Sequence, residues 1–396
     1  VLLARCSASF PGAALTPALL ILCFNVPVTT CRVSVLAFTF AYGLTRSCMP
    51  FKSVFRAIAS IPILAPSLLP AIALIYLFGN QGMITELLMG ESIYGPIGIM
   101  IGMVFYIFPH ALMIMVTALS MTDARLYEAA QAMGAGPVRV FFTVTLPGAI
   151  YGVVSAAVVA FTLTITDFGV PKVIGGQYNV LATDIYKQVI GQQNFSMGAV
   201  VGIVLLIPAI FSFTIDRIVQ RKQVALLSAR AVPYHPKPHR GRDGAMLVFC
   251  ILMSVFLIGI LGTAAFASLV KFWPYNLSLT LAHYDFDKVD PNGWSSFYNS
   301  LSMAGFTAVI GVAVVFVGAY LTEKGKGFAP LRGFFHMLSM MPMAVPGLVL
   351  GLAYVFFFSR PENPLSGIYG TMAILVVCTM IHFSTVPSFT FIQSAT

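Results

Sequence analysis

Side chains that could carry acid–base, nucleophilic or metal chemistry are few and scattered in this sequence. His110 and His382 each stand alone in an apolar stretch, which favours packing over metal ligation. The six cysteines show no CxxC spacing, so the sequence indicates neither a disulfide framework nor a metal site. It contains no GxxxxGKS/T phosphate loop. We therefore predict no catalytic residue, no bound metal and no cofactor on this chain, and we do not expect an enzyme.

A second group of polar residues stands at the end of an apolar stretch. Thr162, Thr164 and Thr166 alternate along the sequence and are followed by Asp167. Such groups can line an aqueous route through a membrane, but a helix-terminal charge at the membrane interface is an equally good interpretation. Thr162, Thr166 and Asp167 are accordingly candidate pore-lining residues, with both interpretations open.

The elements that must position these residues are membrane spans. Hydrophobic residues make up 58% of the chain and charged residues only 9%, whereas soluble domains carry about 25% charged residues. A helix needs roughly 20 apolar residues to cross about 30 Å of hydrocarbon. Eight runs of this kind lie at 57–79, 96–121, 147–166, 197–215, 245–270, 298–321, 333–358 and 368–392.

A ninth apolar run lies within 13–44 and contains Arg32. An arginine in a span is costly, so Arg32 must face a partner or an aqueous pore, or else the amino-terminal residues are atypical of the fold. These alternatives stay open. We expect an all-α, polytopic membrane protein with about 8–9 transmembrane helices.

The charges of the loops predict the orientation of these spans. The loops at 45–56, 122–146, 216–244 and 322–332 hold fifteen Lys and Arg residues against five acidic residues, whereas the opposite loops hold five against eight. The positive-inside rule places the basic set in the cytoplasm. Retention of basic residues beside the inner leaflet thus explains the net positive charge of the chain. No nucleic acid is expected as a partner.

The most specific pattern is a stretch of mixed polar and apolar residues between two predicted spans. It reads EAAQAMGAGPVRVFFTVTLP and covers residues 128–147. It resembles the coupling loop of ABC importer permeases, in which EAA is followed by three residues, a glycine, nine residues, an aliphatic residue, one further residue and Leu-Pro. The positions that match are Glu128, Ala129, Ala130, Gly134, Val144, Leu146 and Pro147. Valine replaces the usual isoleucine at the aliphatic position.

The residues around this run predict two short helices joined by a turn. Asp123 can cap the first helix, Gly134 suits the left-handed residue that ends it, and Pro137 fits the first turn of the second helix. We expect one apolar face on the first helix, made of Leu126, Tyr127, Ala130 and Met133.

The resemblance implies a coupling helix that seats on a separate ATPase subunit. It assigns polar contact to Glu128, close packing to Ala129 and Ala130, and the turn to Gly134. ABC ATPase subunits, an extracytoplasmic substrate-binding protein and the lipid bilayer are then the expected partners, and ATP is bound by the ATPase. The expected location is the bacterial inner membrane, with multiple passes. An ordinary amphipathic interfacial helix is the alternative interpretation.

The chain also repeats itself with a period of about 280 residues. Residues 61–78 align with 341–358, where the proline and alanine positions coincide in three pairs, Pro62 with Pro342, Pro66 with Pro346 and Ala73 with Ala353. This repeat predicts two homologous permease halves in parallel orientation. The resemblance then implies two permease halves of the type I ABC importer group, fused in one chain.

The predicted boundaries follow from this repeat. The first half covers 1–216, of which 1–32 match the resemblance poorly, and the second covers 245–396. A basic, proline-bearing cytoplasmic linker at 217–244 joins them, and we interpret it as a solvated tether. The second half is expected to be incomplete, with the counterpart of Glu128 beyond its last residue.

The substrate is expected from resemblance alone. Fused permeases of this kind are similar to importers of ferric iron, thiamine and 2-aminoethylphosphonate. Residues 44–52 and 166–195 look like the 2-aminoethylphosphonate branch, so the phosphonate is the expected substrate and ferric iron or thiamine the alternative. An ion-coupled secondary transporter is the alternative of another class, but it commonly needs ionisable residues within its spans, and this sequence has almost none apart from Arg32.

Overall fold

The computed structural model describes residues 15–226, 232, 234–288, 291–324, 334, 342 and 345–384. Within these ranges six helices are long and apolar enough to cross a membrane, or seven if a bent pair of helices counts as one span. Two shorter apolar helices lie near the carboxyl end. Helices suit a bilayer because they satisfy their own backbone hydrogen bonds where water is absent. The predicted all-α, polytopic membrane fold is confirmed.

Contacts divide the chain into two compact units, the first made of 1–184 and 211–279 and the second of 185–210 and 280–396. These units differ from the predicted halves, because 211–279 contain the first span of the predicted second half. The compact units are defined by contacts in the structure, whereas the predicted halves are defined by repetition in the sequence, so the two divisions need not coincide. The boundaries at 216 and 245 therefore stay a prediction.

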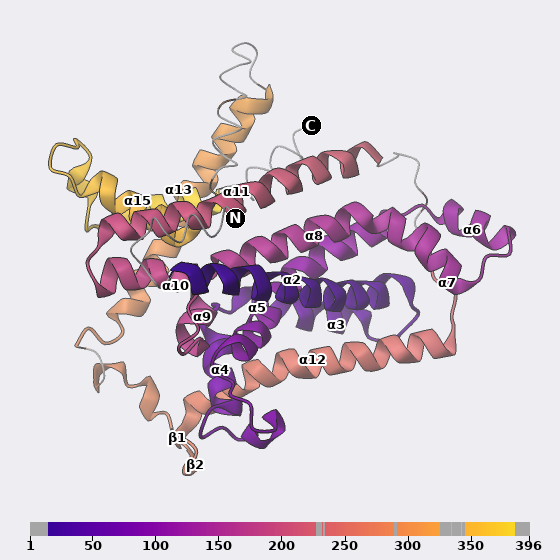
Figure 1. The fold of residues 1–396 in the computed structure, drawn as a ribbon, viewed down its shortest axis with the longest axis horizontal. Helices are drawn as coiled ribbons and strands as arrows, with labels where there is room; N and C mark the ends of the chain where they lie inside the picture. The colour runs from indigo at the N-terminus through magenta and orange to yellow at the C-terminus, as the bar shows by residue number, and fades with distance from the viewer. Residues whose placement is uncertain are drawn as a thin grey trace. The chain divides into compact units, whose positions relative to one another are not determined.

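The first unit is built on three packed helices, α2 (Leu15–Arg46), α5 (Pro96–Ser120) and α8 (Leu146–Thr166) (Figure 1). Aromatic residues fill the space between them, and the rings of Phe40 and Phe108 meet edge to face with centroids 5.4 Å apart. Both rings are fully buried. Small residues let α5 and α8 approach closely, since a Cβ added at Gly152 would overlap the Cβ of Ala118.

The predicted span at 57–79 is wrong as a continuous helix. The chain instead forms α3 (Lys52–Ser60), the 3-10 helix η1 (Ile61–Leu64) and α4 (Leu68–Phe78), with a bend of 103° between the two segments. Pro66 explains the break, because a proline disfavours the helical conformation of the residue before it. That residue, Ala65, is extended, with φ −89° and ψ 133°.

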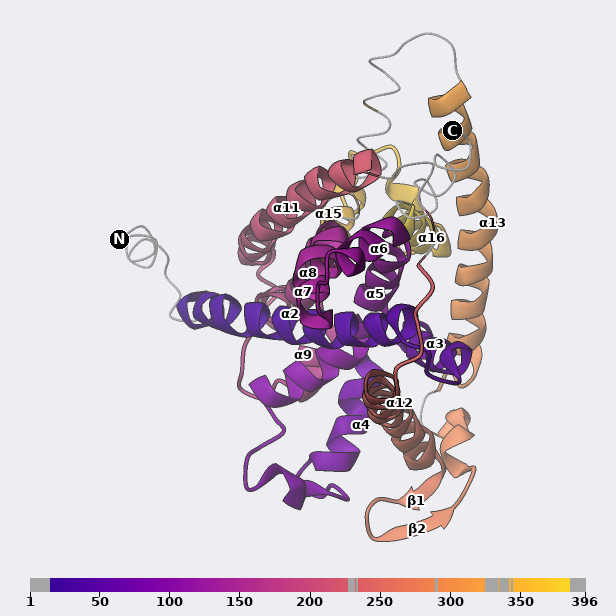
Figure 2. The same cartoon turned by 90° about the vertical axis from the view of Figure 1, so that its right-hand side faces the viewer.

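The helix α12 (Arg240–Leu269) also belongs to the first unit, where it packs against α4, α2 and α3 (Figure 2). It leads into a hairpin of β1 (Val270–Phe272) and β2 (Asn276–Leu279), which the sequence did not predict. The indole of Trp273 donates to the carbonyl oxygen of Gln81 at 3.1 Å and stacks edge to face on Tyr76. The hairpin is thus held by Tyr76 in the last turn of α4 and by Gln81 just beyond it.

The second unit contains α13 (Ser295–Lys324), α15 (Gly347–Phe358) and α16 (Met372–Phe383), and α16 packs against the other two. The helix α11 (Phe195–Leu226) contributes residues to both units. Within the second unit the rings of Phe195 and Phe356 meet with centroids 6.0 Å apart. The predicted spans at 333–358 and 368–392 lie partly outside the described residues.

Short helices connect these elements. They are η2 (Thr85–Leu88), α9 (Gly169–Ile174), α10 (Leu181–Tyr186), η4 (Lys187–Gly191), η5 (Ala282–Tyr284), η6 (Phe286–Lys288) and η8 (Ser366–Ile368). The residues around the EAA run form α6 (Ala124–Ala132), α7 (Pro137–Val140) and the π-helical turn η3 (Phe141–Thr145), which continues directly into α8.

Candidate functional site

The helix α6 has the local structure that its sequence predicts. The carboxylate of Asp123 accepts from the backbone N–H of Arg125 at 3.0 Å and so caps the amino end. At the other end Gly134 is left-handed, with φ 72°. The N–H of Ala135 donates to the carbonyl oxygen of Ala130 and that of Gly134 to Gln131. These two bonds form a Schellman motif, which ends the helix without leaving its last carbonyl groups unpaired.

The element after the turn is not a separate short helix. Pro137 occupies the first turn of α7, as predicted, but α7, η3 and α8 run on as one span of 30 residues, Pro137–Thr166. The Leu-Pro end of the pattern, Leu146 and Pro147, starts α8. Val144 and Leu146 are half-buried and Pro147 is exposed. The positions that match the coupling-loop pattern therefore include both the turn after α6 and the start of a transmembrane helix.

The expected single apolar face of α6 is wrong. Tyr127 and Ala130 are buried within the chain, whereas Leu126 is 53% and Met133 80% exposed. The reason is helical geometry, because successive residues are turned by about 100°, so 126 and 133 share a side that 127 and 130 do not. Ala130 thus packs against its own chain.

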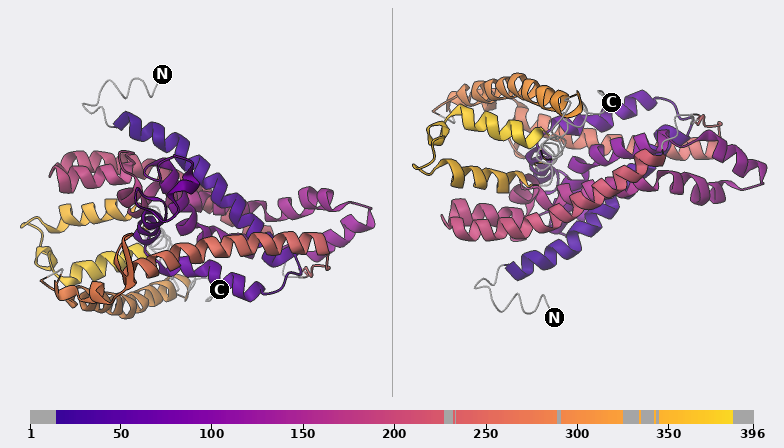
Figure 3. Two further views of the ribbon diagram at one scale, coloured as in Figure 1. Left: turned by 90° about the horizontal axis from the view of Figure 1, so that it is seen from below. Right: turned by 90° about the horizontal axis from the view of Figure 1, so that it is seen from above.

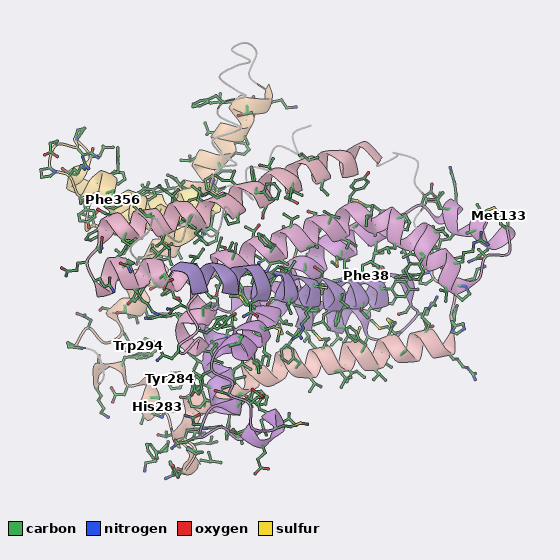
Figure 4. All side chains as sticks on the ribbon, in the orientation of Figure 1. Phe38, Met133, His283, Tyr284, Trp294 and Phe356 are labelled. Carbon is green, nitrogen blue, oxygen red and sulfur yellow. The ribbon has the colours of Figure 1, made fainter. Side chains whose placement is uncertain are left out.

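The exposed side of α6 carries Leu126, Glu128, Ala129 and Met133, and we call these four residues the α6 outer surface. The α6–α7 segment, purple in both views of Figure 3, lies beyond the ends of the long helices of the first unit. Figure 4 shows Met133 at its outer tip. Exposed apolar side chains on a short capped helix are typical of a docking surface rather than of a core.

The buried side of α6 is anchored by hydrogen bonds that the sequence did not reveal. The hydroxyl of Tyr127 accepts from Nε of Arg46 at 3.1 Å and donates to Oγ1 of Thr145 at 3.1 Å. Nη2 of Arg46 donates to the carbonyl oxygen of Leu119 at 2.5 Å. All three side chains are buried. Tyr127 thereby connects α6 to the end of α2 and the start of α8, and Arg46 extends this connection to the end of α5.

A second contact fixes the segment that follows the turn. The ring of Phe141 meets Phe38 and Tyr42 of α2 edge to face, with centroids 6.0 and 5.9 Å apart. Phe38, which is labelled in Figure 4, belongs to α2, the helix that ends at Arg46. The chain from α6 to η3 is consequently attached to α2 at two places, Tyr127 and Phe141, so a displacement of α6 should move α2.

The candidate pore-lining residues have local partners. The hydroxyl of Thr162 donates to the carbonyl oxygen of Val158 and that of Thr166 to Thr162, each within α8. The carboxylate of Asp167 accepts from the N–H of Val170 at 2.9 Å, where α9 begins. The structure therefore gives these side chains bonds within their own helix or turn. Their role in a pore stays a prediction.

Asp167 also reaches the break in the bent span. Burial raises the pKa of Asp167, and hydrogen bonds from Val170, Ser67 and Gly169 oppose that rise. A Cβ added at Gly169 would overlap Oγ of Ser67, which lies in the break between η1 and α4. Asp167 thus links the turn after α8 to the bent span, a role that its sequence position did not indicate.

Sequence comparisons identify the family. Residues 34–224, which contain α6, its anchors Arg46 and Thr145 and the whole of α8, match the family described as binding-protein-dependent transport system inner membrane component. This region of the chain belongs to the family of ABC importer permeases. The chain is a multi-pass protein of the inner membrane, as predicted, and its family is one of transport permeases rather than of enzymes.

Three relatives illustrate the similarity. The putative ferric transport system permease protein FbpB 1 of Haemophilus influenzae is 25% identical over 364 residues, which cover 88% of this chain and 56% of that protein. The ferric transport system permease protein FbpB of Actinobacillus pleuropneumoniae is 23% identical, covering 88% and 52%. The molybdenum transport system permease protein ModB of Escherichia coli K12 is 30% identical over 139 residues, covering 33% and 58%. The permease spans little more than half the length of the two ferric relatives.

Sequence reasoning missed Arg46, Thr145 and the hydroxyl of Tyr127. Arg46 counted only as one of the basic loop residues, although it stands at the end of α2 and is 3% exposed. Its partners lie 81 and 73 residues further along the chain. The arginine at the end of a predicted span was a signal for a cytoplasmic boundary, but nothing in the sequence identified its partners.

Proposed function

We propose that this permease is the membrane component of an ATP-driven importer and that the α6 outer surface receives a separately made ATPase subunit. The observation that carries the proposal is the two-sided character of α6, whose Tyr127 side is buried and bonded while its Met133 side is exposed. The ATPase binds the ATP, and an extracytoplasmic binding protein delivers the solute that the permease moves into the cytoplasm.

The contacts of α6 suggest how hydrolysis is transmitted. A coupling element can work only if it moves as a rigid body with the helices behind it. Tyr127 and Arg46 together join α6 to α2, α5 and α8, which are the three packed helices of the first unit. Closure of the ATPase would then displace the ends of all three helices together. Glu128 is exposed on α6 and is available for polar contact with the ATPase.

Ferric iron is the substrate that we propose. Two ferric transport permeases align with 88% of this chain, which supports the iron alternative better than 2-aminoethylphosphonate. The resemblance of residues 44–52 and 166–195 to the phosphonate branch is a shorter and weaker argument. An ion-coupled carrier receives no support from the family, whose description names a binding protein.

The docking proposal predicts the effect of a charge at Met133. Met133→Asp should reduce co-purification of the ATPase with the permease by about tenfold or more, because residues at the centre of an interface commonly contribute 2 kcal/mol or more to binding. Co-purification from native membranes after mild cross-linking measures this. Met89→Asp is the matched control, since Met89 is 93% exposed but lies outside α6. Equal capture by both variants, or no capture by the wild type, would contradict the proposal.

The transport proposal predicts uptake that depends on three components. Proteoliposomes holding the permease and its ATPase, with ATP enclosed and the binding protein outside, should accumulate ferric iron. Omitting ATP, the ATPase or the binding protein should abolish the uptake. Accumulation driven by an ion gradient alone would instead identify a carrier. Uptake and tight binding of 2-aminoethylphosphonate in place of iron would reverse the choice of substrate but retain the importer.

A further inference from the structure

The segment that enters α12 is bonded to α6 instead of forming a solvated tether. Residues 217–226 continue α11, and α12 begins at Arg240. Between them, the carbonyl oxygen of Val232 accepts from the N–H of Ala124 at 2.9 Å, and the N–H of Val232 reaches the carboxylate of Asp123 at 3.4 Å. Both contacts are at the amino end of α6. The predicted linker is therefore attached to the coupling element in its described part.

A tyrosine of the same segment stacks on the anchor of α6. The rings of Tyr234 and Tyr127 lie with centroids 4.3 Å apart and planes inclined by 38°. The guanidinium carbon of Arg46 is 4.8 Å from the Tyr234 centroid and 5.2 Å from the Tyr127 centroid. Arg46 thus contacts the two rings and also donates to the Tyr127 hydroxyl.

Arg46 is buried and, among the described residues, neither salt bridge involves it. Its donors are met by the carbonyl oxygen of Leu119, in the last turn of α5, and by the hydroxyl of Tyr127. The carboxyl end of a helix carries a partial negative charge, and aromatic faces attract a desolvated cation. Removing either ring would leave part of this charge uncompensated.

The segment continues along the first unit beyond Tyr234. The carbonyl oxygen of Pro236 accepts from Sγ of Cys48 at 3.1 Å, and the carboxylate of Asp243 accepts from the N–H of Cys48 at 3.0 Å. Cys48 follows the end of α2 by two residues. The path from α6 to α12 is therefore bonded at successive points, with no free span between Tyr234 and the first turn of α12.

We propose that Arg46, Tyr127 and Tyr234 form a coupling joint, through which the segment 232–243 transmits the motion of α6 to α12. The proposal rests on the proposed docking of an ATPase at the α6 outer surface. Arg46 and Tyr234 are positioning residues, which act by holding α6 against the ends of α2 and α5. A rigid joint moves α12 together with α6, whereas a loose segment leaves α12 behind.

The test measures transport per ATP hydrolysed by the reconstituted importer. Tyr234→Ala should leave ATPase co-purification unchanged but reduce uptake per ATP by roughly two- to thirtyfold, the range that corresponds to a cation–π contact of about 0.5–2 kcal/mol. Tyr234→Phe, which keeps the ring, should restore the wild-type ratio. His235→Ala is the matched control, since His235 is exposed in the same segment. A wild-type ratio in Tyr234→Ala would overturn the joint.

A second measurement needs no ATPase and separates the two proposals. In inside-out membrane vesicles, trypsin should cleave after Arg240, which is exposed and precedes Gly241, at least threefold faster in Tyr234→Ala and Tyr127→Ala than in the wild type or in His235→Ala. Faster cleavage supports the joint even if the wild-type permease captures no ATPase, which would defeat only the proposed docking. Equal cleavage in all four proteins would overturn the joint while leaving the docking proposal intact.

Discussion

Replacing Gly134 with valine is expected to weaken capture of the ATPase by roughly five- to a hundredfold, with a matching loss of uptake. Gly134 holds φ 72°, and a non-glycine residue in such a conformation costs on the order of 1–3 kcal/mol. A β-branched side chain is at the upper end of that range. Relief of the strain would open the Schellman motif and redirect the end of α6, which carries Met133. Co-purification and proteoliposome uptake measure the two effects.

Gly136 supplies the matched control for this prediction. It lies two residues away in the same turn, its φ is −67°, and a Cβ added there would meet no atom within 4 Å. A Cβ at Gly134 is equally free of neighbours, so space does not distinguish the two positions. Gly136→Val should therefore behave as the wild type, and Gly134→Asn should fall between them because asparagine tolerates the left-handed region. Equal defects in both valine variants would refute the assigned role of the turn.

Replacing Gly152 with valine is expected to prevent the first unit from packing and to remove most of the folded permease from the membrane. The Cβ of the new residue would overlap the Cβ of Ala118, which is a short side chain with no rotamer to change. The helices α5 and α8 must then separate, and overpacking of this kind costs about 1–3 kcal/mol even where some adjustment is available. Thermal unfolding in detergent and the amount of monodisperse protein report the outcome.

Exchanging the small residues at positions 152 and 118 tests whether the contact between α5 and α8, rather than any change at Gly152, is what destabilises the protein. Gly152→Ala alone should lower the unfolding temperature, and adding Ala118→Gly should restore it, because the pair would then carry one methyl group as in the wild type. Gly259→Val is the control within a span, since a Cβ at Gly259 in α12 would meet no atom within 4 Å. If Ala118→Gly fails to rescue Gly152→Ala, the contact between these helices is not what limits stability.

The two predictions address different steps from sequence to function. Gly134 acts through backbone conformation in a short exposed turn, so its replacement should spare the helices behind it. Gly152 acts through contact between two transmembrane helices, so its replacement should damage folding before any question of docking arises. Protein yield therefore separates them: Gly134→Val should accumulate normally, whereas Gly152→Val should not.

Much of the local structure could be predicted from the residues. Runs of apolar residues predicted α5, α8, α12 and α13 to within a few residues, apart from the turns that extend α8 towards Pro137. The cap at Asp123, the left-handed Gly134 and the proline at the start of α7 were also predictable. Each depends on neighbouring residues only, because capping, turn conformation and backbone satisfaction in lipid are decided within one or two helical turns.

Other features were decided by contacts between distant residues. Helical geometry places Tyr127 and Met133 on different sides of α6, and the bonds of Arg46 and Thr145 to Tyr127 determine that the Tyr127 side is the buried one. The basic segment that was expected to be solvated is held at Val232 and Tyr234, more than 100 residues after its partners on α6. The residue types in the sequence did not indicate which of these distant residues would be in contact.

Thus the amino-acid sequence by itself determined the membrane class, most of the helical spans and the cap and turn of α6, because hydrophobicity and backbone conformation act locally. Only the tertiary structure decided which side of α6 is exposed, and that the segment before α12 contacts Arg46 and Tyr127. Those outcomes depend on where the ends of α2, α5 and α8 meet, and packing alone brings Arg46, Tyr127 and Tyr234 to that place.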